Sequence, residues 1–545
     1  MSKVAHYLQE HLIGEVMSSA DARQYFSTDA SILSVPPSII VYPHNENDVR
    51  KTARFTWQLA ERGRVIPITP RGLGTDQSGA SLGTGIIIVF PAHMNKVLEL
   101  DPKTGVVAAQ AGINYGKLQQ ALHTHGRFLP PAPSDIESCT LGGALGNNAG
   151  GEKSLKYGVI KDFVQGLRVV LANGEVIETG RLNKREASKK MGLNSFEGEI
   201  YRAVDKLIEE NKELIEKTKL GVTKNAAGYN LADVKHKDGS VDLTPLFVGA
   251  QGTLGVITEA ILETESYNQN VTLVVALIED FERASKAVLD LRNLAEKPSA
   301  IEMVDSNLLN FIDRHNPNQL KGIIEKPYQK IALLVEFDNA NARVQKRLAK
   351  KAKHIIEDYG GTCQVEIDPE KQDQLWRIRH MAASVATYAE GNVRALPFIE
   401  DAIVPVDKLD QLLSGVYAIF DRYNLEAAVW GHAGDANLSL QPFLDLAQLG
   451  DRQKLFRIMD EYYNLVFSLG GSTTGEQGDG RVRGAYLKVL YGEDIYKLFK
   501  QLKNIFDPYG ILNPGVKLDV TIEQLKPMLR SEYSVGHLYN HMPRA

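Results

Sequence analysis

Residues 138–158 read SCTLGGALGNNAGGEKSLKYG, and this stretch limits the kind of fold that the chain can form. Five of its glycines lie close together: Gly142, Gly143, Gly146, Gly150 and Gly151. So many glycines are unfavourable inside a helix, and their spacing is too regular for a flexible linker. The sequence therefore predicts a non-helical backbone against which another group lies closely.

A second glycine-rich segment, PRGLGTDQSG (70–79), lies between two apolar runs that are predicted to be strands. A nicotinamide fingerprint needs GxGxxG at the start of a helix, and Gln77 stands where its third glycine would be. Glycines can still turn backbone N–H groups inward to hold an anion. Taken alone, this segment is an anion-binding loop or a turn without a ligand.

A third such segment, VGAQGTLGVITEAIL (248–262), offers another close approach to the backbone, just before a predicted strand. A long, flat ligand with a pyrophosphate would use all three segments. They therefore predict one extended dinucleotide, for which a flavin is the natural candidate.

Composition sets broader limits. A chain of 545 residues is too long for one core and predicts two or three domains, and its 43% hydrophobic and 24% charged residues are typical of globular proteins. A net charge of −5 without a dominant basic face argues against nucleic-acid binding. Cys139 and Cys363 are too few for a disulfide framework.

The apolar runs are far shorter than a membrane span requires, and residues 1–17 lack the pattern of a secretory signal. We therefore expect a cytoplasmic protein. In the first part of the chain, strands are predicted at 38–43, 64–70 and 85–90, with an amphipathic helix over 46–63.

The segment GHAGDANLSLQP (431–442) places His432 and Asp435 on a small-residue loop between two predicted strands. A histidine at position 439 could converge with His432 on a metal ion. Position 439 is serine, a much poorer ligand. Either the chemistry has changed here, or it never depended on this position.

Eight motifs occur in the order found in the FAD-linked oxidase family of the vanillyl-alcohol oxidase superfamily, which includes the glycolate oxidase flavin subunit, D-lactate dehydrogenases and D-2-hydroxyglutarate dehydrogenases. They are YFSTDASILSVPPSIIVYP, PRGLGTDQSG, LGGALGNNAGGEKSLKYG, AAGYNL, GAQGTLGVITEA, GHAGDANL, GGSTTGEQGDGR and FDPYGILNPG. The resemblance covers residues 25 to 518, nearly the whole chain.

This resemblance implies an α+β fold with a two-part FAD-binding domain of the vanillyl-alcohol oxidase (PCMH) type and a ferredoxin-like α/β cap. The implied divisions are 1–266 for the FAD-binding domain, with its core over 34–266, then 267–500 for the cap and 501–545 for a segment that returns to the first domain. Apolar runs and helical patterns alternate after Ser266 in a ferredoxin-like order: 271–278, 280–297, 330–338, 340–358 and 363–367.

The resemblance also implies which residues hold FAD. They are Arg71, Gly72, Leu73, Gly74, Thr75, Ser78, Gly79, Thr140, Leu141, Gly142, Gly143, Gly146, Asn148, Gly151, Gly255, Ile257 and Asn513. Some relatives attach FAD through a histidine in the first loop, where Thr75 stands here, so non-covalent FAD is expected. Gln251 replaces a glutamate that is common in the family.

On the substrate side, the family's reaction moves a hydride from a 2-hydroxy acid to the flavin while a base takes the hydroxyl proton. Arg379 resembles the carboxylate-binding arginine, and its other interpretation is a surface ion pair. Glu400 and Asp401 are expected to border the pocket. His432 is the best remaining base candidate, unless it only packs beside the flavin.

Many relatives have histidines at the positions of Ser439 and Gln477. With both replaced, His432 and Glu476 form at most a weak two-ligand metal site, so a divalent metal is doubtful. The implied catalytic set is therefore His432, Arg379 and Glu476.

Arg481 and Arg483 either favour an anionic substrate or pair with Asp479 or Glu476.

Two functions remain open. The first is an FAD-dependent dehydrogenase acting on a small anionic 2-hydroxy acid of the D-lactate or glycolate type. It would pass electrons to a quinone or an electron-carrier protein, with a possible peripheral membrane contact. The alternative is a flavin-binding protein whose hydroxy-acid chemistry is altered or lost.

Overall fold

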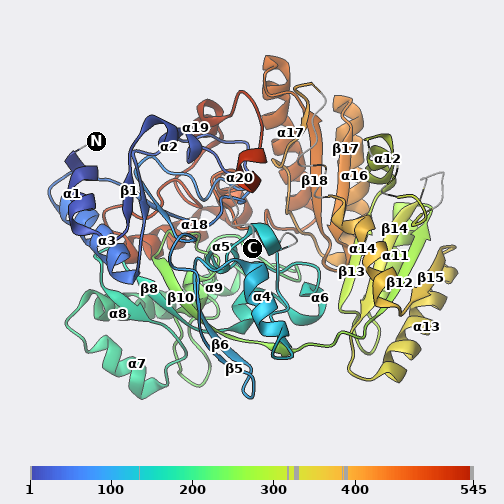
Figure 1. Ribbon diagram of the computed structural model, residues 1–545, viewed down its shortest axis with the longest axis horizontal. Helices are drawn as coiled ribbons and strands as arrows, with labels where there is room; N and C mark the ends of the chain where they lie inside the picture. Colours follow the sequence, from blue (N-terminus) through green and yellow to red (C-terminus); the bar gives the residue numbers. More distant parts are fainter. Residues whose placement is uncertain are drawn as a thin grey trace.

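The computed structural model describes residues 3–540 except 134–135, 316–317, 319, 325–329, 383–384 and 386–390. Figure 1 shows two regions side by side: N-terminal and C-terminal elements together on the left, and a large sheet with its helices on the right.

A small mixed sheet forms near the N-terminus. Its strands lie in the order β1 (Glu15–Met17), β2 (Ile39–Tyr42), β4 (Ile86–Val89) and β3 (Ile68–Arg71). Both β2 and β3 run parallel to β4, whose four residues are all buried, as is typical of a central parallel strand. The crossover is α3 (Glu46–Glu61), which begins where the Asn45 side chain accepts from the Asp48 N–H. The strands and the helix predicted here are confirmed.

A second, antiparallel sheet lies beside the first. Its order is β5 (Val97–Asp101), β6 (Val106–Gln110), β10 (Val256–Glu263), β8 (Val164–Val170) and β9 (Val176–Glu178). In β10, buried residues alternate with more exposed ones, which is the period expected of a strand with one face on a core. That core is completed by α4 (Tyr115–His123) and α8 (Phe196–Glu210).

The expectation of a non-helical backbone after residue 138 is wrong. Leu141–Asn147 form a helix, α5, although the segment contains three glycines. The Thr140 hydroxyl caps it by accepting from the Gly143 N–H at 3.1 Å. A Cβ on Gly142 would lie 2.9 Å from the Ala111 carbonyl oxygen. Close backbone packing therefore requires glycine inside this helix and outweighs its poor helix propensity.

A seven-stranded sheet forms the right side of Figure 1, in the order β15-β12-β14-β13-β17-β18-β16. The strands are β12 (Thr272–Ile278), β13 (Ala300–Val304), β14 (Ile331–Phe337), β15 (Thr362–Glu366), β16 (Arg394–Ala395), β17 (Ala427–His432) and β18 (Asn437–Leu444).

The first four of these strands have the predicted ferredoxin-like order. The helix α11 (Phe281–Arg292) connects β12 to β13, and α13 (Ala342–Asp358) connects β14 to β15. The sequence did not predict β13, because Glu302 interrupts its short apolar run.

The chain returns to the N-terminal sheets through α18 (Leu487–Phe506). The ring of Phe506 packs edge-on against Phe247 with centroids 5.4 Å apart. Next, the Ile68 N–H donates to the Ile511 carbonyl at 2.7 Å, and the Asn513 N–H donates to the Ile68 carbonyl at 2.8 Å. This return begins before residue 500, and the domain divisions at 266 and 500 stay predictions.

Within the described part of the chain, no helix is both long enough and apolar enough to cross a membrane.

Candidate active site

A cavity of about 340 Å³ lies between the glycine-rich segments and the large sheet. Most of the residues predicted to bind the cofactor or substrate line it: Arg71, Gly72, Leu73, Gly74, Thr75, Thr140, Gly142, Gly143, Gly146, Gly255, Ile257, Arg379, His432 and Glu476. The structure therefore brings together three segments that are far apart in sequence, with the candidate catalytic residues facing them.

Six predicted cofactor residues lie outside this lining: Ser78, Gly79, Leu141, Asn148, Gly151 and Asn513. The Asn513 amide donates to the carbonyls of Ala80 and Gln251, both at 2.8 Å, and accepts from the Thr69 hydroxyl at 2.9 Å. Asn148, at φ 59°, ends α5. These two residues thus shape the loops behind the cavity wall.

The first loop fits a bound pyrophosphate. Arg71 is 3% exposed, and its guanidinium donates to the Thr28 carbonyl at 2.8 Å. Its Nη1 is buried without a hydrogen-bond partner, so a donor remains at the cavity wall for an anion. Opposite, a Cβ on Gly143 would meet only the Thr140 hydroxyl, at 3.3 Å, so this glycine leaves room on the cavity side.

The Gln251 side chain forms hydrogen bonds both to α5 and to the segment that contains Gln477 and Gly480. It has a φ of 53°, and its amide nitrogen donates to Asn147 Oδ1 at 3.0 Å and to the Gln477 carbonyl at 3.2 Å. Its Oε1 accepts from the Gly480 N–H at 2.8 Å. The residue at 251 therefore needs an amide nitrogen to donate, which the family's usual glutamate lacks.

His432 lies at the end of β17, between two carboxylates. Its Nδ1 is 2.7 Å from Glu302 Oε1, and its Nε2 is 3.0 Å from Glu476 Oε1. Burial alone would lower the pKa of His432, but the charges of the two carboxylates outweigh this effect and raise the pKa to about 10. The imidazole is therefore protonated at neutral pH and donates from both nitrogens.

The two carboxylates tie His432 to two further cations. Glu302 is fully buried and accepts from Arg379 Nε at 2.6 Å. Glu476 accepts from Lys224 Nζ at 2.5 Å and from the Gly151 N–H at 2.7 Å. The alternative interpretation of Arg379, a surface ion pair, is wrong, because Arg379 is 3% exposed and lines the cavity.

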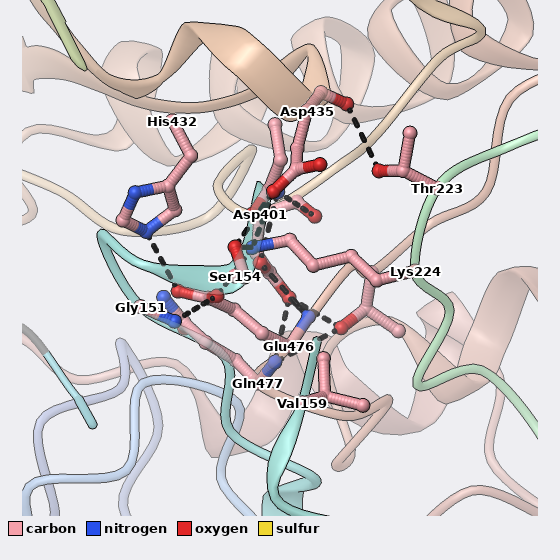
Figure 2. Close-up of polar contacts among 12 residues, drawn as sticks. Gly151, Ser154, Val159, Thr223, Lys224, Asp401, His432, Asp435, Glu476 and Gln477 are labelled. Atoms are coloured by element: carbon pink, nitrogen blue, oxygen red, sulfur yellow. Dashed lines mark hydrogen bonds and ion pairs between the residues drawn. The ribbon is translucent and has the colours of Figure 1, made fainter. Parts of the chain in front are cut away.

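Figure 2 shows how this network continues behind Glu476. Lys224 Nζ also donates to the Ser154 hydroxyl at 3.1 Å, and that hydroxyl donates to Asp435 at 2.6 Å. Asp435, the second residue singled out in the hairpin loop, is thus a buried support for Ser154 and does not line the cavity.

Side chains on one face of the hairpin formed by β17 and β18 line the cavity. His432 pairs with Asn437, and Trp430 pairs with Ser439, so these residues share one face. Gln441 lies two residues further along β18, on the same face, and all five residues line the cavity.

Ser439 and Gln477 both contact Glu400. The Ser439 hydroxyl is 3.2 Å from Glu400 Oε1, and Gln477 Nε2 is 2.6 Å from the same oxygen. Glu400 and Asp401 line the cavity. Ser439 and Gln477, which stand where many relatives have histidines, therefore both donate hydrogen bonds to the same carboxylate.

The interpretation of Arg481 and Arg483 as partners of Asp479 or Glu476 is wrong, and their effect on an anionic substrate stays a prediction. Neither lines the cavity, and Asp479 pairs instead with Lys517 at 2.7 Å. Arg483 is 1% exposed and donates to the carbonyls of Glu400 and Gly478. It therefore shapes the cavity wall from behind.

The residues present do not fit a divalent metal. Among the described residues, no group of three or more His, Cys, Asp or Glu side chains is arranged to hold one. Both nitrogens of His432 are occupied by carboxylates, and the Lys224 ammonium lies on Glu476, where a metal would need a free oxygen.

Sequence reasoning missed Glu302 and Lys224. A lone charged residue within the apolar run of β13 was the available signal for Glu302, because a carboxylate in a fully buried strand needs a partner. Lys224 precedes the AAGYNL motif and has no comparable signal.

Comparison with known proteins agrees with this geometry. The model of the family described as "FAD binding domain" matches residues 37–180, and that of "FAD linked oxidases, C-terminal domain" matches residues 267–516. The first glycine-rich loop and α5 thus lie in an FAD-binding domain, and FAD is the cofactor of this chain.

Relatives extend over nearly the whole chain. The D-2-hydroxyglutarate dehydrogenase of Escherichia coli (strain K12) is 31% identical over 93% of this chain and 50% of its own length. The glycolate oxidase subunit GlcD of Bacillus subtilis (strain 168) is 29% identical over 88% of each chain. The D-lactate dehydrogenase of Archaeoglobus fulgidus is 27% identical over 92% of this chain and 97% of its own length. The chain spans about half the length of the D-2-hydroxyglutarate dehydrogenases that it matches.

A solved structure supports the fold alone. The 4-ethylphenol oxidase from Gulosibacter chungangensis superposes with a TM-score of 0.65 at 15% identity, covering 96% of this chain and 99% of that one. This agrees with the predicted fold of a two-part FAD-binding domain and a cap. With both family models matched in order and the site formed between them, the chain belongs to the FAD-linked oxidase family.

Proposed function

We propose that this protein oxidises a 2-hydroxy acid with FAD as the hydride acceptor. One observation carries the proposal: a buried cluster of Arg379, Glu302, His432 and Glu476 opens on the same cavity as the FAD-binding loops. A 2-hydroxy acid needs a cation for its carboxylate and an acceptor for its hydroxyl proton, and this cluster can supply both.

In this proposal Arg379 binds the substrate carboxylate. Glu302 accepts from its Nε and so fixes the orientation of the guanidinium group at the cavity wall. FAD, when bound, takes the hydride from the carbinol carbon. The chain itself has to orient the acid and accept one proton.

His432 takes the hydroxyl proton through Nε2. Its Nδ1 is fixed by the shorter contact to the fully buried Glu302, so Nε2 is the nitrogen that can exchange its partner for substrate. Glu476 and Glu302 are positioning residues that hold the ring. Because the pKa of His432 is raised to about 10, only a small neutral fraction acts as base near neutral pH.

The electron acceptor and the location are proposals from composition and family resemblance. We propose a quinone or an electron-carrier protein as acceptor, with a possible peripheral membrane contact. A cytoplasmic location stays a prediction from the sequence, with which the small number of cysteines agrees.

The alternative is a flavin-binding protein that has lost hydroxy-acid chemistry. Its support is the replacement of two family histidines by Ser439 and Gln477. The retained cluster of Arg379, His432 and Glu476 favours the oxidase.

Anaerobic mixing of the purified FAD-loaded protein with a panel of D- and L-2-hydroxy acids tests the proposal. We expect at least one acid to bleach the flavin absorbance. Arg379→Lys, which keeps the charge but loses the fork geometry, should weaken reduction by raising KM. A flavin that stays oxidised with every acid would favour the alternative.

A further inference from the structure

Glu400 lines the cavity, and within the described part of the chain only uncharged groups donate hydrogen bonds to its carboxylate. Ser439 and Gln477 donate to Oε1, and Gln441 Nε2 donates to Oε2 at 3.4 Å. In the amide orientation that matches donors with acceptors, Gln77 also donates to this carboxylate. Burial raises the pKa of Glu400, whereas the hydrogen bonds from Gln477 and Gln441 favour its ionised form.

The orientation of Gln477 is fixed from behind. Arg483 Nη2 donates to Gln477 Oε1 at 3.2 Å, so the Gln477 nitrogen must face Glu400. Arg483 Nε meets Glu400 only at the backbone carbonyl, at 3.1 Å. Of the residues that the structure describes, none that is cationic donates a hydrogen bond to the side chain of Glu400.

Gln441 supplies the second, independent observation. It is 2% exposed and lines the cavity, and its Oε1 is buried without a hydrogen-bond partner. The contact from its Nε2 to Glu400 fixes the amide orientation, so the unpartnered atom is an acceptor. An unsatisfied buried acceptor is costly, which indicates that a donor is supplied from outside the protein.

We propose that the part of the cavity lined by Glu400 and Gln441 binds a hydrogen-bond donor on the substrate, a hydroxyl or an ammonium group other than the hydroxyl that is oxidised. This inference rests on the proposed function and narrows its substrate class. Asp401 also lines this part, so a second substrate carboxylate placed there would meet like charge. The favoured substrates are thus monocarboxylic 2-hydroxy acids with a second hydrogen-bond donor.

Four acids of similar length test this inference in the natural holoenzyme: 2-hydroxybutanoate, 2,4-dihydroxybutanoate, 4-amino-2-hydroxybutanoate and 2-hydroxyglutarate. With an artificial electron acceptor, kcat/KM should be at least about tenfold higher for one of the two donor-bearing acids than for 2-hydroxybutanoate. It should be lowest for 2-hydroxyglutarate. The comparison between hydroxyl and ammonium identifies which donor the site takes.

Two variants locate the effect. Gln441→Leu should reduce by about tenfold the ratio of kcat/KM for the donor-bearing acid to kcat/KM for 2-hydroxybutanoate, both measured on the variant. Gln364→Leu, at an exposed position of β15 in the same sheet, is the matched control and should leave this ratio unchanged. Glu400→Gln should reduce preference for the ammonium acid and improve 2-hydroxyglutarate.

The outcomes separate the two proposals. Equal or better use of 2-hydroxybutanoate or 2-hydroxyglutarate by the natural protein would overturn this inference and leave the proposed function intact. Survival of the donor advantage in a folded Gln441→Leu protein would also overturn it. If Gln441→Leu does not fold, the inference is tested by the kcat/KM ratios of the natural protein for the four acids. Failure of every 2-hydroxy acid to reduce the flavin would overturn the proposed function, and this inference with it.

Discussion

His432 is the residue whose charge most constrains the chemistry of the cavity. It lies between Glu302 and Glu476, and each carboxylate is shared with a cation, Arg379 or Lys224. A buried network of alternating positive and negative side chains is stable only when each charge has an oppositely charged partner. Changing one member should therefore alter the protonation of the next.

The raised pKa of His432 predicts an alkaline pH profile. A base must be neutral, and with a pKa of about 10 only about one molecule in a thousand is neutral at pH 7. We expect kcat/KM for a 2-hydroxy acid to rise about tenfold per pH unit from pH 7 to 9 and to level off near pH 10.

Glu302→Gln is the control for this assignment. It removes a negative charge beside the ring, so it should lower the pKa of His432 and move the rise in kcat/KM to lower pH. A profile that falls with rising pH in the natural protein would remove His432 from the role of base.

A metal should be dispensable. Since Lys224 lies 2.5 Å from Glu476, the natural protein should retain well under one zinc or manganese per chain after dialysis, and added metal should barely change turnover. The double change Ser439→His and Gln477→His should raise metal occupancy by adding two imidazole ligands to His432 and Glu476. Metal analysis of both proteins checks this, and one tightly bound metal per natural chain would contradict it.

FAD should be released by acid. Thr75 stands near the position of the attached histidine in some relatives, and its hydroxyl donates to the Ser138 carbonyl at 2.7 Å. A threonine hydroxyl at this position is not expected to form the flavin linkage. Acid precipitation should therefore leave all flavin in the supernatant, and a yellow washed pellet would refute non-covalent binding.

At the scale of elements, α5 has a sequence with low helix propensity and lies in close contact with neighbouring backbone. Thr140 caps the helix, and Gly142 packs against the carbonyl of Ala111. Its cavity side carries Gly143 and Gly146, which present backbone and little else. A side chain at either glycine would therefore take space from the cofactor.

Gly143→Val should abolish FAD binding. The branched side chain would project where Gly143 now leaves room in the cavity. Gly221→Val is the matched control, since no atom lies within 4 Å of a Cβ built on that exposed glycine. Flavin absorbance per chain measures both. Normal occupancy in a folded Gly143→Val protein would refute the assignment of this element to the cofactor.

At the scale of the whole molecule, a buried ion pair joins distant parts of the chain. Lys517 and Asp479 are both fully buried, with Nζ and Oδ2 2.7 Å apart. Asp479 also accepts from the Gly228 N–H at 2.8 Å. The pair therefore connects the C-terminal segment, the GEQGDGR motif and the AAGYNL motif.

Lys517→Met should destabilise the protein strongly, because it leaves a buried carboxylate without its cation. We expect the free energy of unfolding to fall by about 3–5 kcal/mol. Lys500→Met is the matched control, since Lys500 pairs with Asp519 at 2.7 Å on the exposed surface and should cost at most about 1 kcal/mol. Thermal unfolding of the two variants under the same conditions compares them. Equal midpoints would show that the buried pair does not hold the segments together.

The sequence by itself determined the features that depend on local pattern. Glycine-rich segments predicted a dinucleotide, and the period of apolar residues predicted the ferredoxin-like order of β12, α11, α13 and β15. Motif order predicted the family, and most of the residues that it assigned to the cofactor line the cavity. These features can be recognised in the sequence alone, because each depends on residues within a short window or on the order of motifs.

Only the tertiary structure decided which charges meet. Glu302 and His432 are 130 residues apart, and Lys224 and Glu476 are 252 apart, so no spacing rule connects them. The same holds for α5, whose glycines looked unsuited to a helix until Ala111 was seen against Gly142. Propensity and spacing describe a chain in isolation, whereas burial and pairing depend on what the fold places beside each side chain.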